Sequence, residues 1–410
     1  MKLLLAGDVG RTVKLSLIAV QENVKTITKK DDLRILYENS YPMRSYALED
    51  MIEKFLKEVP QKSDAPLDLS GACFAVPGPV VNNEMEFLTC IETLLGYSAV
   101  SIRNTNIDFQ NFKKWKKLSA TSLQENLKIP HVSLINDYES VCYGIHLLSI
   151  SEESKEDLYL LKKGKISNNQ SQVEDRIAAL GVGTGLGKAF MLKKNDDTLK
   201  VCATEGGHTD FPPCSEEDSD LSESIKDSIQ RTSSGRPSRI SVEKVVSGHG
   251  IIDIYKFLRE KKKYPESEKI KRELETYDRE FKHALERNEA LEQSVDPPAA
   301  IAQAAIFNKE DKLCTETMKK FLQILGAEAG NFVLKVLPYG RRCLAGEIGL
   351  YLAGGIVPKI LPLLEEDDSF YQSFLNKGRM SDQLKDIPIY VVLNREVGLL
   401  GAAYCAAQLR

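Results

Sequence analysis

Short apolar runs alternate with helix-like segments along the first third of this 410-residue chain. The strand-like runs cover residues 2–6, 13–20, 72–76 and 131–135. Between them, residues 48–59 and 119–127 carry apolar residues at helical spacing. This alternation favours an α/β sheet, in which ligands bind at the carboxyl ends of the strands.

The same pattern restarts after Gly144. Further strand-like runs cover residues 177–180, 188–193, 199–203 and 387–393, and residues 350–361 read as strand, glycine turn and helix. An alanine-rich helix is expected at residues 397–408. The pattern therefore predicts two lobes: a small α/β domain of residues 1–145 plus 394–410, and a large α/β domain of residues 146–393.

Charged segments interrupt the second lobe. Residues 216–239 are rich in serine and charge, which favours a loop or a weakly ordered helix. Residues 257–292 are dominated by Lys, Glu and Arg, with apolar residues at helical spacing. One or two solvent-exposed helices fit that pattern, and a partner surface is the alternative. Residues 299–337 indicate long amphipathic helices.

Charge and cysteine usage exclude several classes of protein. The net charge is -4, from 55 basic and 59 acidic residues, so no electrostatic footprint for nucleic acid is present. The eight cysteines lie far apart without a C-x-x-C pair, which favours free thiols over a zinc site. No apolar run approaches the roughly 20 residues of a membrane span. We expect a cytoplasmic protein without nucleic-acid or membrane partners.

Three glycine-containing turns follow predicted strands. They are "GDVGRT" at residues 7–12, "GVGTGLG" at 181–187 and "LAGGI" at 352–356. Glycines let backbone N–H groups approach a phosphate closely, and the Thr184 hydroxyl adds a donor. Each stretch alone fits a plain turn, a hairpin or a helix cap equally well. Together, across two lobes, they indicate a nucleotide held in a cleft.

Polar residues gather in other turns of the chain. Asn136 and Asp137 end a strand, and Glu205 and His208 flank two glycines. Alone, the first pair also fits a turn and the second a metal site, although a third ligand at standard spacing is missing. Glu243 also fits an acid in the first turn of a helix. As a set, with the amides of residues 104–106, they match the paired hydrogen bonds that a hexose requires.

These motifs resemble those of the bacterial-type glucokinases, ATP-dependent hexokinases of the actin-like and sugar-kinase superfamily. "GDVGRT" is similar to the first phosphate segment of that family, and "INDYES" to its Asn-Asp motif. "GVGTGLG", "TEGGHTDFPP", "SVEKVVSGHG" and "YLAGGIVPKIL" follow in the family order. The resemblance covers residues 3 to about 403 and implies a two-lobed ribonuclease H-like α/β fold with an active-site cleft between the lobes.

The resemblance also implies a reaction and its residues. The γ-phosphoryl group of Mg-ATP passes to the 6-hydroxyl of glucose, giving glucose 6-phosphate and ADP. Asp137 accepts the hydroxyl proton, and Asp8 lies near Mg²⁺, through water. The residues implied to bind glucose are Asn106, Asn136, Asp137, Glu205, His208 and Glu243. Those implied to bind ATP are Asp8, Gly10, Arg11, Thr12, Gly183, Thr184, Gly185, Gly354 and Gly355.

The chain departs from the family pattern at three places. Arg11 stands where the family has a glycine, inserted residues separate Asn106 from Trp115, and His249 replaces a residue that is often proline. A kinase for another hexose or N-acetylhexosamine, and a catalytically silent sugar-binding protein on the same fold, are the alternatives. ADP or polyphosphate is the alternative phosphoryl donor. The assembly expected is a homodimer. The helix-turn-helix and the cysteine-rich zinc motif of related regulators are absent from the sequence.

Overall fold

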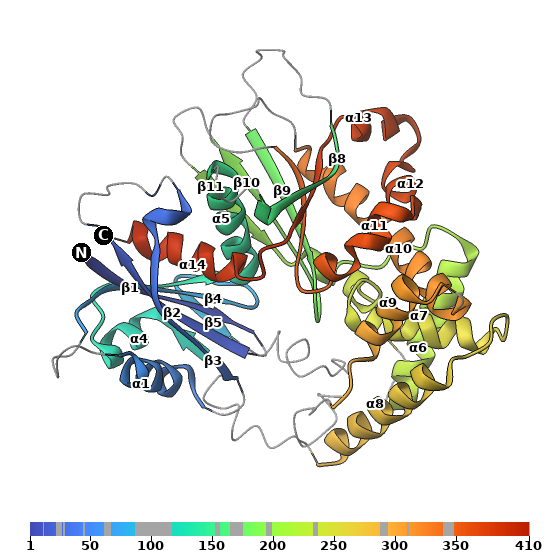
Figure 1. Ribbon diagram of the computed structural model, residues 1–410, viewed down its shortest axis with the longest axis horizontal. Coiled ribbons are helices and arrows are strands. Elements are labelled where there is room, and N and C mark those ends of the chain that lie inside the picture. The colour runs from blue at the N-terminus through green and yellow to red at the C-terminus, as the bar shows by residue number, and fades with distance from the viewer. Residues whose placement is uncertain are drawn as a thin grey trace.

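A computed structural model describes most of the chain. The described residues are 1–10, 12–21, 27, 29–43, 46–60, 67–86, 117–151, 156–164, 175–193, 199–232, 237–287, 294–309, 311–338 and 348–409. Within them, the chain forms two large β-sheets with helices on their faces (Figure 1). A small ladder of β5 (Glu84–Glu86) and β6 (Lys117–Ser119) accompanies the first sheet.

The first sheet has five strands in the order β3-β2-β1-β4-β7. Their bounds are β1 Lys2–Val9, β2 Thr12–Val20, β3 Arg34–Pro42, β4 Leu69–Val76 and β7 Val132–Asn136. Strands β1, β4 and β7 run parallel, so their carboxyl ends meet at one edge. The helices α1 (Leu48–Glu58) and α4 (Ala120–Leu127) bury residues such as Phe55 and Leu123 in the core on one face of this sheet.

The second sheet has six strands in the order β11-β10-β9-β12-β13-β8. Their bounds are β8 Leu158–Lys162, β9 Asp175–Val182, β10 Leu186–Lys193, β11 Leu199–Thr204, β12 Gly349–Ala353 and β13 Ile389–Val392. The helices α7 (Gly248–Glu260) and α10 (Lys312–Val336) pack against it in the largest core of the molecule. Side-chain caps start both helices: Ser247 Oγ accepts from Gly250 N, and Asp311 Oδ1 accepts from Cys314 N.

Two helices fill the space between the sheets, as Figure 1 shows. They are α5 (Asp137–Ile150) and α14 (Val397–Gln408). A Cβ added at Gly144 would lie 2.0 Å from the Val397 carbonyl oxygen, and one at Gly401 would lie 1.7 Å from that of Ser140. Glycine at these positions therefore lets the two helices cross in close contact. The last helix does return to the first sheet, while the domain boundaries themselves stay a prediction.

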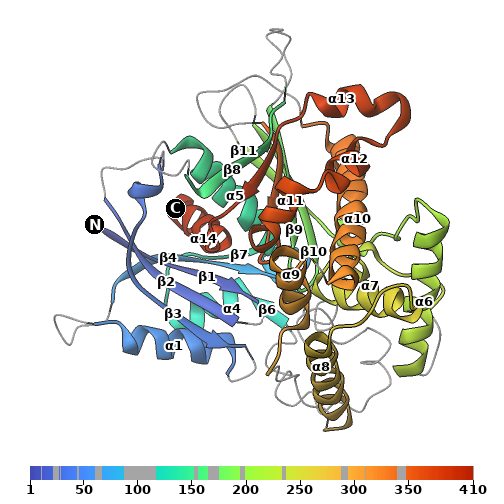
Figure 2. The same ribbon diagram turned by 45° about the vertical axis from the view of Figure 1, so that its right-hand side comes forward.

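The remaining helices surround α7 and α10 (Figure 2). They are α6 Glu216–Thr232, α8 Glu268–Arg287, α9 Pro297–Phe307, α11 Leu361–Glu366, α12 Ser369–Leu375 and α13 Ser381–Lys385. Phe281 of α8 also packs against the core of the first sheet. Short 3₁₀ helices occupy Lys30–Asp32, Gly206–His208, Val242–Lys244, Val357–Ile360 and Gly378–Met380.

The charged segments are better ordered than their composition suggests. Instead of a loop or weak helix, residues 216–232 form α6, because Leu221 and Ile225 are buried in the core. Residues 257–292 supply the end of α7 and all of α8, so the expected helices are confirmed. They are not simply solvent-exposed, since Ile270, Leu274 and Tyr277 of α8 are also buried there.

Two further features follow from the described residues. Their six cysteines are all free, as expected, and Cys90 and Cys343 lie outside the described part. Among the helices described, none combines the length and the apolar character that crossing a membrane requires.

Candidate active site

A cavity of about 220 Å³ lies between the two sheets, where the parallel strands of the first sheet end. One wall consists of Asp8, Asn136 and Asp137, at or just beyond the carboxyl ends of β1 and β7. The opposite wall belongs to the second lobe and carries Glu205, His208 and Glu243, together with residues 183–187. Five of the six predicted sugar-binding residues are therefore brought together from distant parts of the chain, as expected. The sixth, Asn106, lies outside the described residues.

Asn136 and Asp137 mark the junction between β7 and α5. The Asn136 side chain caps the helix, because its Oδ1 accepts hydrogen bonds from the N–H groups of Tyr138 (2.9 Å) and Glu139 (3.2 Å). Its Nδ2 donates to the Gly78 carbonyl oxygen at 3.0 Å. Asn136 thus uses its oxygen to start the helix and keeps one amide hydrogen for a ligand. Asp137, the first helical residue, projects into the cavity.

The carboxylate of Asp137 has an unusually high proton affinity. Burial raises its pKa from 3.8 to about 7, and the negative charges of Asp8 and Glu205 add to the shift. The hydrogen bond from Tyr138 N to its Oδ1 acts in the opposite direction but is weaker. A carboxylate with a pKa near neutrality can accept a proton efficiently at physiological pH. This is the property that a general base requires.

Asp8 lies close to the ion pair between Lys14 and Glu396. Burial raises the pKa of Asp8 to about 6, Lys14 lowers it and Glu396 raises it. Lys14 faces Asp8 across the β1–β2 ladder, yet its Nζ contacts Glu396 Oε1 at 2.6 Å. Gly398, in the first turn of α14, leaves room for the carboxylate, since a Cβ there would lie 3.2 Å from Asp8 Oδ2. The Asp8 carboxylate is therefore poorly compensated within the described protein.

Glu205, His208 and Glu243 form a polar cluster on the opposite wall. His208 Nε2 lies 3.6 Å from Glu205 Oε2, and His208 Nδ1 lies 3.4 Å from Glu243 Oε1. The other Glu243 oxygen accepts a hydrogen bond from Leu186 N at 3.3 Å. Burial raises the pKa of Glu205, and His208 partly opposes that shift. Among the described residues, no group of three or more histidine, cysteine, aspartate or glutamate side chains is arranged to hold a metal ion.

The glycine-rich stretch forms the hairpin between β9 and β10. Its turn, residues 183–185, borders the cavity, and Gly183 N donates to the Gly185 carbonyl oxygen at 3.0 Å. Gly181 and Gly187 have a different purpose. A Cβ at Gly181 would lie 2.2 Å from the Tyr138 hydroxyl oxygen and one at Gly187 1.7 Å from the Tyr138 ring, so these glycines make room for Tyr138 rather than for a phosphate.

A second, larger cavity of about 780 Å³ begins at the same hairpin turn. Gly183 and Thr184 border both cavities, so a ligand can extend from one into the other. The walls of the larger cavity are mostly apolar and come from α7, α9 and the 3₁₀ helix Val357–Ile360. The buried Tyr277 of α8 also borders it, and its hydroxyl lies 3.0 Å from His249 Nδ1. A flat heterocycle linked to a polyphosphate matches this joint shape.

Comparison with known proteins identifies the family. The glucokinase family model matches residues 89–409. The glucokinase of Trichormus variabilis is 39% identical over 412 residues, which cover 100% of both chains. This chain belongs to the glucokinase family.

Solved structures of glucokinases confirm the predicted two-lobed fold. The enzyme of Balamuthia mandrillaris, solved in complex with glucose, aligns over 99% of this chain and 93% of its own, with a TM-score of 0.64 and 20% identity. A ROK family glucokinase from Streptomyces griseus, in complex with glucose and AMPPNP, covers 99% of both chains with a TM-score of 0.52 and 16% identity. At these identities the likeness concerns the fold alone.

Only some of the remaining predicted nucleotide-binding residues of this glucokinase family member border a cavity. Gly10 borders the smaller cavity and Gly355 the larger one. Gly354 adopts φ +91°, and a Cβ there would lie 2.4 Å from the Val182 carbonyl oxygen, so a tight turn requires this glycine. Thr12 is exposed and borders neither cavity. Arg11 lies outside the described residues.

Several residues of both cavities are absent from the sequence-based prediction. Pro77 and Gly78 border the smaller cavity just after β4, and a proline-glycine pair after a strand is a signal that could have revealed them. Tyr138 and Tyr277 carry no such signal. Each reaches its cavity through a contact between segments that are distant in the sequence.

Proposed function

We propose that this member of the glucokinase family transfers the γ-phosphoryl group of ATP to the 6-hydroxyl of glucose, with Asp137 as the general base. One observation carries this proposal. The Asp137 carboxylate, with a pKa of about 7, lines a small cavity that contains several carboxylates and whose glycine hairpin opens into a larger one lined mostly by apolar residues. A sugar in the first cavity and a nucleotide in the second would meet at the hairpin turn.

The base acts on the hydroxyl that attacks. As the sugar oxygen forms its bond to phosphorus, Asp137 accepts the hydroxyl proton, and the bond between phosphorus and the ADP oxygen breaks. Asp137 extends from the first turn of α5, whose position the Asn136 cap fixes. The proton acceptor is therefore held on a rigid element, which favours a reactive alignment.

The remaining hydroxyls of the sugar have partners on the second lobe. Glu205 and Glu243 offer carboxylate oxygens, and His208 lies between them. These groups accept or donate paired hydrogen bonds without a large net positive charge, as a neutral hexose requires. Because the wall with Asp137 belongs to the other lobe, closure of the lobes on glucose would exclude water and limit hydrolysis of ATP.

Asp8 fits the role of a carboxylate near Mg²⁺. The ion prefers oxygen ligands and keeps several water molecules, with few carboxylates and the substrate phosphates completing its shell. Asp8 is partly buried beside the cavity with a raised pKa, and Lys14 already pairs with Glu396. When bound, the cation neutralises charge on the transferred phosphoryl group. The Asp8 carboxylate would hold it through water.

Purified protein should phosphorylate glucose in an assay that couples ADP formation to a coloured product. The same assay with mannose, fructose, N-acetylglucosamine and N-acetylmannosamine tests which sugar is the acceptor. To test the phosphoryl donor, ADP or polyphosphate replaces ATP and glucose 6-phosphate is measured directly. A higher kcat/KM for another sugar would reassign the acceptor. Glucose binding by calorimetry without turnover would instead select the catalytically silent alternative.

Replacement of Asp8 tests the metal site. Asp8→Ala should raise the Mg²⁺ concentration that gives half-maximal rate, because the ion loses its protein anchor, while glucose binding measured by calorimetry stays nearly unchanged. Asp68→Ala, an exposed carboxylate just before β4, serves as a control for losing one carboxylate. An unchanged Mg²⁺ titration would show that Asp8 takes no part in binding the ion. The cytoplasmic location and the homodimer stay predictions.

A further inference from the structure

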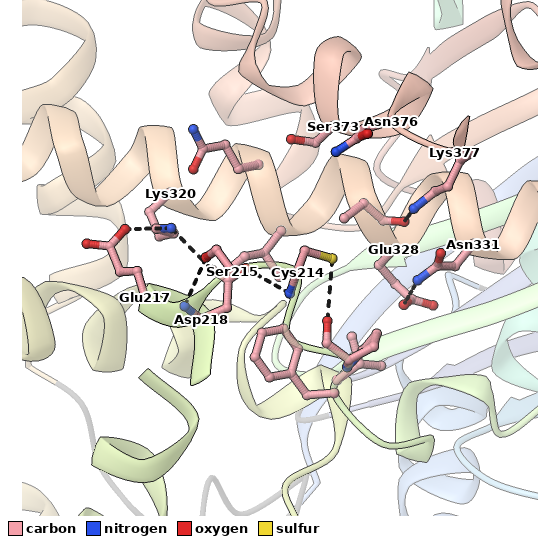
Figure 3. A pocket seen from close by; sticks show the side chains of 16 residues that line it. Cys214, Ser215, Glu217, Asp218, Lys320, Glu328, Asn331, Ser373, Asn376 and Lys377 are labelled. Atoms are coloured by element: carbon pink, nitrogen blue, oxygen red, sulfur yellow. Dashed lines mark hydrogen bonds and ion pairs between the residues drawn. The ribbon is translucent and has the colours of Figure 1, made fainter. Parts of the chain in front are cut away.

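A third cavity, of about 410 Å³, lies behind the sugar-binding wall. Figure 3 shows it beside α10, with Lys320, Glu328 and Asn331 on that helix. Cys214 and Ser215 border it from the start of α6, and Asn376 and Lys377 from the end of α12. None of its lining residues borders either of the other two cavities.

The wall that separates this cavity from the sugar-binding cavity is a single layer of chain. Phe211 and Val242 border the rear cavity, whereas His208 and Glu243, close by in sequence, border the sugar-binding cavity. Backbone hydrogen bonds join the two segments, from Phe211 N to Ile240 O at 3.0 Å and from Val242 N to Thr209 O at 2.9 Å. Any displacement of the wall therefore affects both cavities.

A buried ion pair connects the same wall to α10. Lys188 Nζ lies 2.6 Å from Glu328 Oε1, and both side chains are at most 5% exposed. The same ammonium donates to the Gly206 carbonyl oxygen at 2.7 Å, between Glu205 and His208. Glu328 borders the rear cavity. Lys188 thus connects the Glu205–His208 segment to the Glu328 carboxylate. A ligand in the rear cavity would lie close to that carboxylate.

Two lysines border the cavity, and among the described residues Lys320 has ion-pair partners whereas Lys377 does not. Lys320 pairs with Glu217 at 2.7 Å and with Asp218 at 3.2 Å, and Lys261 also contacts Glu217. Lys377 donates to the Ala327 carbonyl oxygen at 3.0 Å, and within the described part of the chain no carboxylate lies within 4.0 Å of its ammonium. Burial lowers the pKa of Lys377, and the nearby Cys214 thiol and Glu328 carboxylate oppose that shift without cancelling it, so a bound anion would oppose it further.

Neutral hydrogen-bonding groups surround the Lys377 corner. The amides of Asn331 and Asn376 and the hydroxyl of Ser373 border the cavity there (Figure 3), and Asn331 Nδ2 also donates to Glu328 Oε2 at 3.4 Å. An ammonium flanked by amide and hydroxyl donors is a good environment for a carboxylate or a phosphate ester. The volume is within the range of small-molecule pockets.

We propose that the rear cavity is a second binding site, for a small organic anion, and that its occupancy strengthens glucose binding. The anionic group contacts Lys377, and the bound molecule holds α10, α12 and the shared wall in one arrangement. Glucose then meets a wall that is already ordered, so binding loses less conformational entropy. By linkage, glucose strengthens anion binding by the same factor. The effect on glucose rests on the proposed sugar site, whereas the anion site does not.

Binding is tested by calorimetry with citrate, as a carboxylate, and glycerol 3-phosphate, as a phosphate ester, each with glycerol as the neutral control. At least one anion should bind, and Lys377→Gln should weaken that binding about tenfold, since a charge-assisted hydrogen bond is lost. Lys385→Gln, on the neighbouring helix α13, is the matched control. Glutamine can still donate to the Ala327 carbonyl oxygen, so the variant tests charge rather than folding. Failure of both anions to bind, or equal binding by Lys377→Gln, would overturn the site.

The effect on glucose is tested through Cys214, an exposed thiol on the cavity wall. A methanethiosulfonate reagent that carries a sulfonate attaches an anion there, forming a mixed disulfide and releasing methanesulfinate. With modification of Cys214 verified by mass spectrometry, the glucose KM should fall about fivefold while the ATP KM stays within about twofold. The same reagent on Cys214→Ser controls for other thiols, and a reagent that adds only a methyl group controls for charge.

The two proposals fail in distinguishable ways. An unchanged or higher glucose KM in the sulfonate-labelled protein contradicts the coupling, and so does the same fall in labelled Cys214→Ser. A protein that phosphorylates no sugar contradicts the proposed function instead, and the calorimetric comparison of Lys377→Gln still decides whether the anion site exists.

Discussion

The sugar-binding and nucleotide-binding cavities meet at one hairpin turn but are built in different ways. The polar groups of the smaller cavity are carboxylates, an amide and a histidine, most of them at the ends of strands and helices or in short 3₁₀ helices. The larger one is lined mainly by the sides of helices, with apolar residues such as Ile252, Ala302 and Ile356. Binding of a hexose depends on individual polar atoms, whereas burial of a heterocycle depends on shape and area.

This difference predicts unequal sensitivity to substitution. Removal of one hydrogen-bonding partner in a small polar cavity leaves a buried polar group unpaired, which costs about 1–3 kcal/mol. Removal of one side chain from a large apolar wall takes away only part of the contact. Replacements in the sugar-binding cavity should therefore have large, glucose-specific effects, and those in the nucleotide cavity small, ATP-specific ones.

Asp137→Asn should have the largest effect. The amide preserves shape but cannot accept the proton, so kcat should fall about 10² to 10⁴-fold. The glucose dissociation constant, measured by calorimetry, should stay within a few-fold of the original. Glu139→Gln, two residues along α5, is the control. Turnover near the normal rate in the Asn variant would exclude Asp137 as the base.

The pH dependence should follow the protonation of Asp137. Its pKa is raised to about 7, and only the deprotonated form accepts a proton. The value of kcat/KM for glucose should therefore decrease about tenfold per pH unit as the pH falls below the pKa. Bound Mg²⁺ offsets the negative charge of Asp8, so the midpoint at saturating Mg-ATP is expected at or below pH 7. A flat profile between about pH 5 and 7 would contradict the assigned base.

Glu205→Gln should raise the glucose KM about five- to 150-fold, because a sugar hydroxyl buried in the complex would lose a carboxylate acceptor at a cost of about 1–3 kcal/mol. The KM for ATP should remain within about twofold, because Glu205 borders only the smaller cavity. The exposed Glu216→Gln provides the comparison. A change in the KM for ATP alone would show that Glu205 does not bind the sugar. The two cavities would then not differ in the way proposed.

Tyr277→Phe should have the smallest effect. The change removes the hydroxyl that contacts His249 Nδ1 at 3.0 Å and retains the ring that borders the nucleotide cavity. Loss of one such hydrogen bond corresponds to about 0.5–1.5 kcal/mol, so the ATP KM should rise about two- to tenfold. The glucose KM should not change. If both constants change together, α8 affects lobe closure rather than nucleotide contact.

The two cavities also differ in how far the sequence predicts them. Asp8, Asp137 and Glu205 could be found because each follows a strand-like run, where the topology of an α/β sheet places ligands. Tyr277 could not, because its segment reads as a charged surface helix and only tertiary packing turns that residue inward. The apolar face of a helix that lines a pocket has the same kind of residues as one that packs in a core, so the sequence does not distinguish the two.

Local sequence patterns also do not show which role each residue of a motif has in the folded protein. The alternating glycines of residues 181–187 all have the character of a phosphate turn, and the sequence assigns the contact to residues 183–185 without giving a reason for the outer two glycines. In the folded protein, Gly181 and Gly187 accommodate the Tyr138 ring, which comes from α5. For α6, serine and charge conceal an apolar stripe that includes Leu221 and Ile225. Both cases depend on partners that lie dozens of residues away.

The crossing of α5 and α14 has a consequence for how the chain folds during synthesis. Leu4 and Ala6 of β1 share a core cluster with Leu399 and Ala403 of α14, nearly the whole length of the chain later. The part of this face of the first sheet that α5 does not cover therefore stays exposed until the ribosome has made the last helix. Contacts of such long sequence separation form slowly, and the exposed apolar surface favours aggregation in the meantime. The nascent chain should accordingly depend on chaperones until α14 emerges.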